Sequence, residues 1–110
     1  MKLPNARAAR IDPKKLEGYL LSSAHPIGRS KAQFFLAVGF RETEIVILES
    51  ALLEVARTGE VAETQTSAHG VKYTVDGTVL TPSGRQVMLR TIWIVDAGDT
   101  SPRLVTAYPF

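Results

Sequence analysis

The residue types best suited to chemistry gather in the stretch "AHPIGRSK", where a histidine, a glycine and two cations precede an apolar run. His25 titrates near neutral pH and can accept or donate a proton. Gly28 allows close approach of the backbone to a ligand, and Arg29 and Lys31 add positive charge that suits a phosphate. If a helix begins near Ser30, its unpaired N–H groups and its dipole also attract an anion. The stretch therefore describes an anion site with an acid or base beside it.

The same stretch has a structural interpretation. Glycine and proline are ordinary before a helix, and Arg29 and Lys31 can form a solvated face. His25 can cap the C-terminus of a preceding helix, where a cation is favourable. On spacing alone this structural interpretation is favoured, because the motif is short and has no fixed chemistry.

Further candidates lie in the second half of the chain, in segments that alternate like strands. Arg90 occurs within the mainly apolar segment "RQVMLRTIWIV", where a charge needs a partner or a ligand. Thr91 must point to the opposite face of a regular strand, so either a bulge intervenes or one of the two residues is structural. Thr106 and Tyr108 share a face of the last segment. Packing alone explains each of these residues taken singly.

Helical periods come first along the chain and strand patterns later, which predicts an α+β domain. Asp12 and Pro13 are typical of a helix start, Gly39 and Gly59 of helix ends, and Thr43 of a cap for the third helix. Short turns between the strands predict an antiparallel meander. We expect two or three N-terminal helices packed on a four-stranded antiparallel sheet. The expected helices cover 13–22, 30–38 and 44–58, and the expected strands cover 60–66, 70–81, 85–98 and 103–110.

Composition limits the class of protein. The 110 residues favour a single domain, 1–110, and 45% hydrophobic with 22% charged residues is ordinary for a folded domain. The absence of cysteine excludes disulfides, thiolate metal ligands and a cysteine nucleophile, and it fits a reducing cytoplasm. Two histidines without cysteine make a poor zinc site, and no nucleotide-binding motif occurs, so we expect no metal and no cofactor. No apolar run approaches the roughly 20 residues of a membrane span.

The order of motifs resembles a family of small bacterial domains. The motifs are an N-terminal "LPNA", a helix ending in "YLL", the segment "HPIGRSKAQFFLAVGF", a "KYTV" strand, an "RTIWI" strand and a terminal "LVTAYP". Domains of this kind look like the C-terminal ribonuclease domains of polymorphic and contact-dependent toxins. The resemblance implies a fold of the barnase–EndoU–colicin–RelE type and cleavage of RNA without a metal. It also implies a cytoplasmic toxin neutralised by a small antitoxin or immunity protein, and it leaves the oligomeric state open.

The resemblance also assigns roles to residues. His25 matches the histidine of the motif and would carry protons, while Lys31 and Arg90 would hold the phosphate. Residues of the last two strands would orient the phosphate or help to move protons. The predicted site comprises His25, Lys31, Arg90, Thr91, Thr106 and Tyr108 as catalytic residues, with Gly28, Arg29 and Lys31 binding phosphate.

A second hypothesis from another class is a non-catalytic binding or immunity-type module of a toxin–antitoxin pair. It predicts an exposed apolar or acidic patch and no convergence of polar groups. A third hypothesis is a degenerate member of the fold that only assembles into complexes. The ribonuclease hypothesis requires His25, Lys31 and a strand cation to converge, and it fails if His25 and Arg90 lie on opposite sides of the sheet.

Overall fold

The computed structural model of the chain describes residues 1–21 and 29–110. Within these ranges a four-stranded antiparallel sheet in the order β1-β2-β3-β4 follows the helices, which confirms the predicted α+β meander. The helical elements are η1 (Ala6–Ala8), α1 (Pro13–Lys15), η2 (Leu16–Leu20), α2 (Arg29–Ala37), η3 (Glu42–Glu44) and α3 (Ile45–Thr58). The strands are β1 (Glu60–Ser67), β2 (Gly70–Leu80), β3 (Gln86–Asp96) and β4 (Arg103–Pro109).

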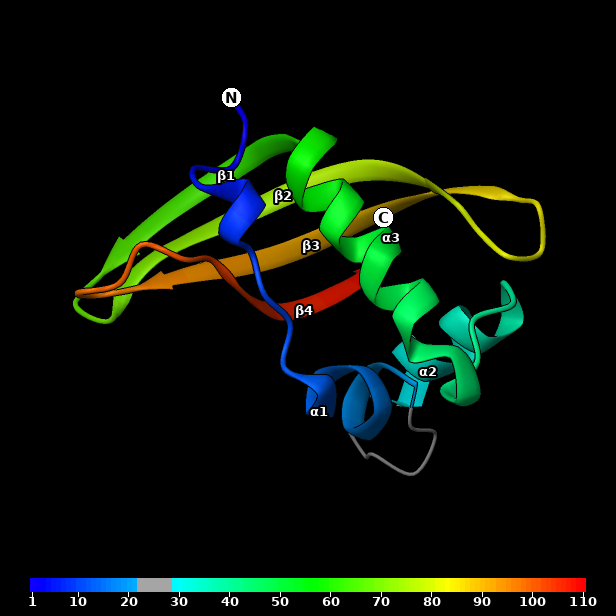
Figure 1. Cartoon of the computed structure of the whole chain (residues 1–110). Helices are drawn as coiled ribbons and strands as arrows, with labels where there is room; N and C mark the ends of the chain where they lie inside the picture. The colour runs from blue at the N-terminus through cyan, green and yellow to red at the C-terminus, as the bar shows by residue number, and fades with distance from the viewer. Residues whose placement is uncertain (22–28) are drawn as a thin grey trace.

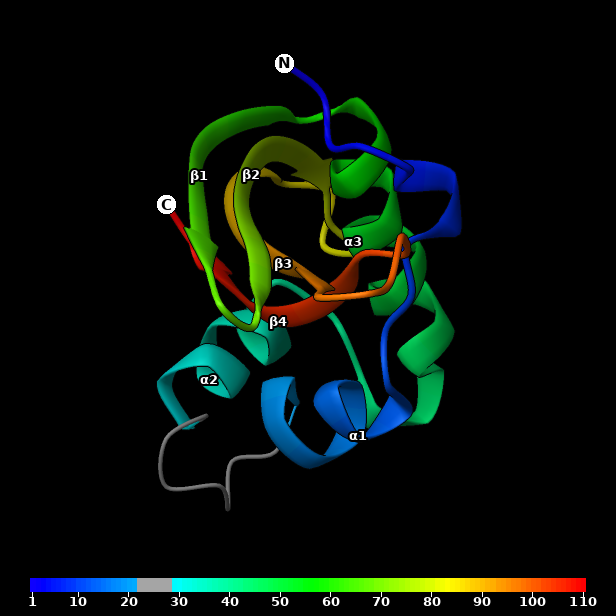
Figure 2. The same cartoon turned by 90° about the vertical axis from the view of Figure 1, so that its left-hand side faces the viewer.

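The helices cover the sheet unevenly. α3 lies across the sheet and packs on β2 and β3, whereas α1 and α2 lie beside β4 (Figure 1). Seen along the sheet, the strands are strongly curved, with α3 on one side and α1 and α2 below β4 (Figure 2). Leu48, Leu52 and Val55 of α3 are buried in one cluster with Trp93 of β3. The sheet face away from α3, which we call the open face, is therefore left for polar side chains.

The N-terminal helices begin and end largely as their capping residues predict. Asp12 accepts a hydrogen bond from the backbone N–H of Lys14, and Pro13 occupies the first turn of α1. α2 stops before Gly39, whose φ of 100° suits glycine. The expectation that Thr43 caps α3 is wrong, because Thr43 lies inside the turn η3 that leads into the helix.

The short helix η2 is wound as a π-helix, and the backbone N–H of Leu21 bonds to the carbonyl of Leu16. This wide turn buries Leu16, Leu20 and Leu21 together. Tyr19 is left half-buried at the rim of the core, beside β4. Single π-turns of this kind often occur at functional sites.

Both edge strands carry a bulge, and each bulge turns a polar side chain onto the open face. In β1 the register shifts between Val61 and Glu63, and in β4 the shift falls between Leu104 and Thr106. In a regular strand each of these pairs would share a face, but the extra residue reverses the alternation. Val61 and Leu104 therefore pack toward the core. A row of side chains crosses the open face from edge to edge: Glu63, Thr74, Ile92 and Thr106.

β3 pairs with β2 along its whole length without a register shift, so its side chains alternate strictly. Thr91 is fully buried on the side of the helices. Its hydroxyl donates to the carbonyl of Val75 at 2.8 Å and accepts from the indole N–H of Trp93 at 2.8 Å. Arg90 faces the other way, across from Asp76. This arrangement corrects the expectation that Thr91 belongs to the site, because its hydrogen-bonding capacity serves the core.

The buried bonds of Thr91 generate a stability prediction. Thr91→Val keeps the volume but leaves the Trp93 indole N–H and the Val75 carbonyl without this partner. We expect a loss of about 1–3 kcal/mol in the free energy of unfolding, measured by urea denaturation. The matched control Thr78→Val, at an exposed position of β2, should stay within about 0.5 kcal/mol of the wild type. Equal stability of the two variants would contradict the structural role of Thr91.

Candidate functional site

Side chains from three separate elements meet at the edge of the open face next to β4. The Lys31 Nζ atom of α2 lies 5.7 Å from the ring centroid of Tyr19 and 5.8 Å from that of Tyr108. The hydroxyls of Tyr19 and Thr106 are hydrogen bonded at 3.3 Å. We call these four residues, Tyr19, Lys31, Thr106 and Tyr108, the tyrosine–lysine cluster. It places a cation between two aromatic rings, where cation–π attraction stabilises it.

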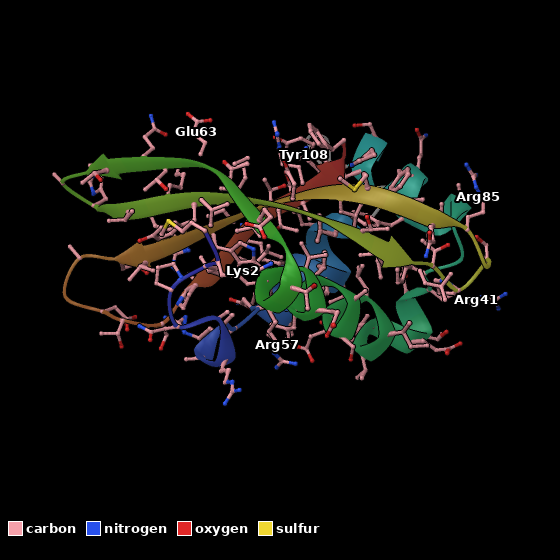
Figure 3. The ribbon with its side chains drawn as sticks, turned by 90° about the horizontal axis from the view of Figure 1, so that it is seen from above. Lys2, Arg41, Arg57, Glu63, Arg85 and Tyr108 are labelled. Carbon is pink, nitrogen blue, oxygen red and sulfur yellow. The ribbon has the colours of Figure 1, made fainter. Side chains whose placement is uncertain are left out.

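The cluster depends on buried neighbours for its position. Ala32 and Phe35 anchor α2 in the core, so Lys31, in the first turn of the helix, stays at its rim. Ala107 is fully buried, and the alternation of β4 therefore turns Thr106 and Tyr108 onto the open face. Figure 3 shows the Tyr108 side chain on the side of the sheet away from α3.

Arg90 adjoins the cluster from β3, where it pairs across the sheet with Tyr108 on one side and Asp76 on the other. Its Nε and Nη2 atoms each donate to a carboxylate oxygen of Asp76 at 2.8 Å. The guanidinium also lies 4.0 Å from the ring centroid of Phe110. The hydrogen bonds to Asp76 raise the pKa of Arg90 above its usual range. Nη1 carries two further N–H groups that this ion pair does not use.

Tyr19 has an altered acidity. Partial burial by itself raises the pKa of its phenol, but hydrogen bonds with Thr106 and Lys31 and the charges of Lys31 and Lys15 outweigh burial. The net result is a pKa below the ordinary value of 10.0. The Lys15 Nζ atom lies 5.5 Å from the Tyr19 ring centroid, so two ammonium groups approach the same phenol.

Two hollows adjoin the cluster. One, of about 540 Å³, is lined by Asp12, Lys14, Lys15, Gly18, Tyr19, Val105 and Thr106. The other, of about 230 Å³, is lined by Glu63, Gln65, Lys72, Thr74, Arg90, Ile92 and Tyr108, and we call it the sheet hollow. Tyr19 and Thr106 belong both to the cluster and to the larger hollow, and Tyr108 belongs both to the cluster and to the sheet hollow. The two hollows and the cluster therefore form one continuous surface along which an extended polymer can lie.

The structure brings together part of the site expected from the sequence. Lys31, Thr106 and Tyr108 meet in the cluster, and Arg90 stands next to it, whereas Thr91 lies on the other face. His25, Gly28 and the side chain of Arg29 lie outside the described part of the chain.

Sequence reasoning missed two residues of the arrangement. Tyr19 falls at helical spacing with Leu16 and Leu20, so the pattern alone groups it with core residues. Only its hydroxyl distinguishes it from a core residue. Asp76 lies on β2 directly across from Arg90 of β3. An acidic residue opposite Arg90 in a β2–β3 hairpin is the sequence signal that indicates this ion pair. That signal requires the register, which the sequence alone does not determine.

Among residues 1–21 and 29–110, no three histidine or acidic side chains come close enough to hold a metal ion. The helices described by the structure include none with the length and apolar character needed to span a bilayer.

Residues 2–110 match the model of a protein family described as "Domain of unknown function (DUF6883)". The chain belongs to the DUF6883 family. A comparison with curated proteins finds no match. Among solved structures, a similar chain occurs in a "Contact-dependent growth inhibition toxin - immunity protein complex from Klebsiella pneumoniae 342". The two chains are 17% identical with a TM-score of 0.73, and the match covers 91% of this DUF6883 chain and 98% of the other. At this identity the likeness shows a shared fold.

The lowered pKa of Tyr19 gives a prediction that needs no substrate. In a titration followed by tyrosinate absorbance, the Tyr19 phenol should ionise at a pH below its ordinary pKa of 10.0, and Tyr19→Phe should remove that step. Lys31→Met should shift the step to higher pH, because the phenolate loses a hydrogen bond and a positive charge. Lys14→Met is the matched control, since Lys14 is not among the groups that act on Tyr19. An unchanged titration of Lys31→Met would contradict the geometry of the cluster.

Proposed function

We propose that this DUF6883 domain is a toxin of the ribonuclease type that cuts RNA without a metal ion. The observation that carries the proposal is the position of Lys31, held between the rings of Tyr19 and Tyr108 beside the hydroxyl of Thr106 on the open face. A localised cation, two phenols and a hydroxyl are suited to hold a phosphodiester and to move protons at it.

The proposed reaction is an attack within the RNA strand. A base removes the proton of a ribose 2′-hydroxyl, and the 2′-oxygen forms a bond to the adjacent phosphorus. The bond from phosphorus to the 5′-oxygen of the next nucleotide breaks, and an acid gives that oxygen a proton. The products are a 2′,3′-cyclic phosphate and a 5′-hydroxyl, so protons and charge balance without a further reactant.

The described residues have clear parts in this scheme. Lys31 stabilises the charge that develops on the non-bridging oxygens, and Arg90, held by Asp76, lies next to it. Thr106 and Tyr108 orient the phosphate, and Tyr19 carries a proton at the cluster. His25 stays a prediction of the sequence as the group that accepts or donates the proton of the reacting hydroxyls.

The solved structure with the similar fold supports the proposal that the domain is a toxin with a protein partner. The similar chain occurs in a contact-dependent growth inhibition toxin–immunity protein complex. By analogy we propose that this domain acts on RNA in the cytoplasm and is neutralised by a small antitoxin or immunity protein. A net charge of +2 is compatible with an anionic substrate.

The test measures cleavage of single-stranded RNA by the purified domain in EDTA. Lys31→Ala should lower the rate about 100-fold, because it removes the localised charge, and His25→Ala should abolish growth arrest in bacteria. Arg57→Ala, on the exposed side of α3 away from the open face (Figure 3), is the charge-matched control and should cut like the wild type. Thermal unfolding of each variant separates loss of activity from loss of fold. A well-folded wild type that leaves RNA intact and does not arrest growth would refute the proposal.

A second candidate function is a binding module that acts only through a protein partner. It is favoured by the exposed apolar side chains Leu36, Val46 and Ile47. Ile47 also lines a hollow of about 400 Å³ together with Phe40 and Pro82. Exposed apolar patches of this kind are typical of protein interfaces.

Val46 is 66% exposed, so Val46→Asp should leave the fold intact while it disrupts an apolar contact. If the domain is only a binding module, Val46→Asp abolishes its effect on cells and Lys31→Ala does not. The ribonuclease proposal gives the opposite result for Lys31→Ala. Growth assays of bacteria that express each variant compare the two directly.

A further inference from the structure

The sheet hollow has the features of a site that recognises a base rather than a phosphate. Ile92 and Thr74 form part of its floor on β3 and β2, and Tyr108 provides an aromatic ring. The Ile92 side chain together with the ring of Tyr108 offers an apolar contact that suits the flat face of an unpaired base. A volume of about 230 Å³ is below that of a typical pocket for a drug-sized ligand, so the hollow suits a group as small as one base.

The charges of the sheet hollow argue against a second phosphate. The carboxylate of Glu63 lines it, and the guanidinium of Arg90 is already paired with Asp76. A phosphate would meet the Glu63 charge without a matching excess of cations. A base, in contrast, carries hydrogen-bond donors and acceptors on one edge and no net charge.

Glu63 and Lys72 are available to contact that edge. Neither side chain makes a hydrogen bond or an ion pair with any other residue of the described ranges. They stand on neighbouring strands at a diagonal spacing, because Glu63 pairs with Thr74 and Lys72 lies two residues before Thr74. Such diagonal neighbours are about 7–8 Å apart, which is within reach of both side chains. The β1 bulge is what turns Glu63 onto this face.

We propose that the sheet hollow binds an unpaired guanine of the RNA strand next to the phosphate held by the tyrosine–lysine cluster. This inference rests on the proposed ribonuclease function. The N1–H and N2–H donors of guanine lie side by side and match the two oxygens of the Glu63 carboxylate. The O6 and N7 acceptors of guanine match the ammonium of Lys72. Adenine, cytosine and uracil do not present two adjacent N–H donors on separate atoms of one edge.

The hollow is continuous with the cluster through Tyr108. Tyr108 lies under Lys31 on one side and lines the sheet hollow on the other. A guanine in the hollow therefore places its own phosphate toward the cluster. Base recognition would then position the phosphodiester for attack, which makes Glu63 a residue that determines specificity.

The experiment adds the four nucleoside 5′-monophosphates separately to ¹⁵N-labelled wild-type protein and follows backbone amide shifts. GMP should shift the amides of Thr74 and Ile92 and bind about tenfold more tightly than AMP, CMP or UMP. Glu63→Gln should reduce the affinity for GMP about tenfold, since an amide offers one acceptor in place of two. The matched control Glu54→Gln, at an exposed position of α3, should keep the preference. Equal binding of the four nucleotides, or shifts confined to another face, would overturn the proposal.

Mapping of the cuts in RNA of mixed sequence separates failure of this inference from failure of the proposed function. If the wild type cuts beside guanine and Glu63→Gln cuts more evenly at the four nucleotides, the result supports both the guanine site and the ribonuclease function. Cutting without a base preference, together with equal nucleotide binding, refutes the guanine site and keeps the ribonuclease. GMP binding without any cutting supports the site and refutes the ribonuclease.

Discussion

The strict alternation of β3 determines what each face of the sheet can do. β3 is hydrogen bonded on both sides, so its register is fixed by β2 and β4 and its side chains cannot change faces. Leu89, Thr91 and Trp93 are buried against the helices, and Arg90 and Ile92 are thereby placed on the open face. The edge strands adapt to this frame through their bulges, which add Glu63 and Thr106 to the same face. The site thus follows from the packing of the core.

Electrostatics then divides the open face into two parts. Near β4 the ammonium groups of Lys15 and Lys31 approach the phenol of Tyr19, and positive charge dominates. Toward β1 the charges balance, because Asp76 is paired with Arg90 and Glu63 accompanies Lys72. A phosphate is favoured in the first part and an uncharged base in the second. Under the proposed function, this difference orients the nucleotide, with its phosphate at the cluster and its base in the sheet hollow.

The sequence predicted the elements well because periodicity and capping are local. Asp12, Pro13, Gly39 and Gly59 mark helix ends in the structure, and the short turns between the strands predicted the meander. The conflict between Arg90 and Thr91 was also visible in the sequence. The sequence did not show how this conflict is resolved, because the choice between a bulge and a structural threonine depends on the long-range register of the strands. Tyr19 was missed for the same reason: its contact with Thr106 joins residues 87 positions apart.

The central claim is that RNA binds on the open face, across the tyrosine–lysine cluster. The most direct test uses a short single-stranded RNA with 2′-deoxyribose at the cleaved position, which binds but lacks the attacking hydroxyl. In backbone amide spectra of the wild type, we predict shifts at Lys31, Thr106 and Tyr108, and at Arg90 and Ile92 of β3. Shifts confined to the outer face of α3, around Val46 and Ile47, would contradict the account.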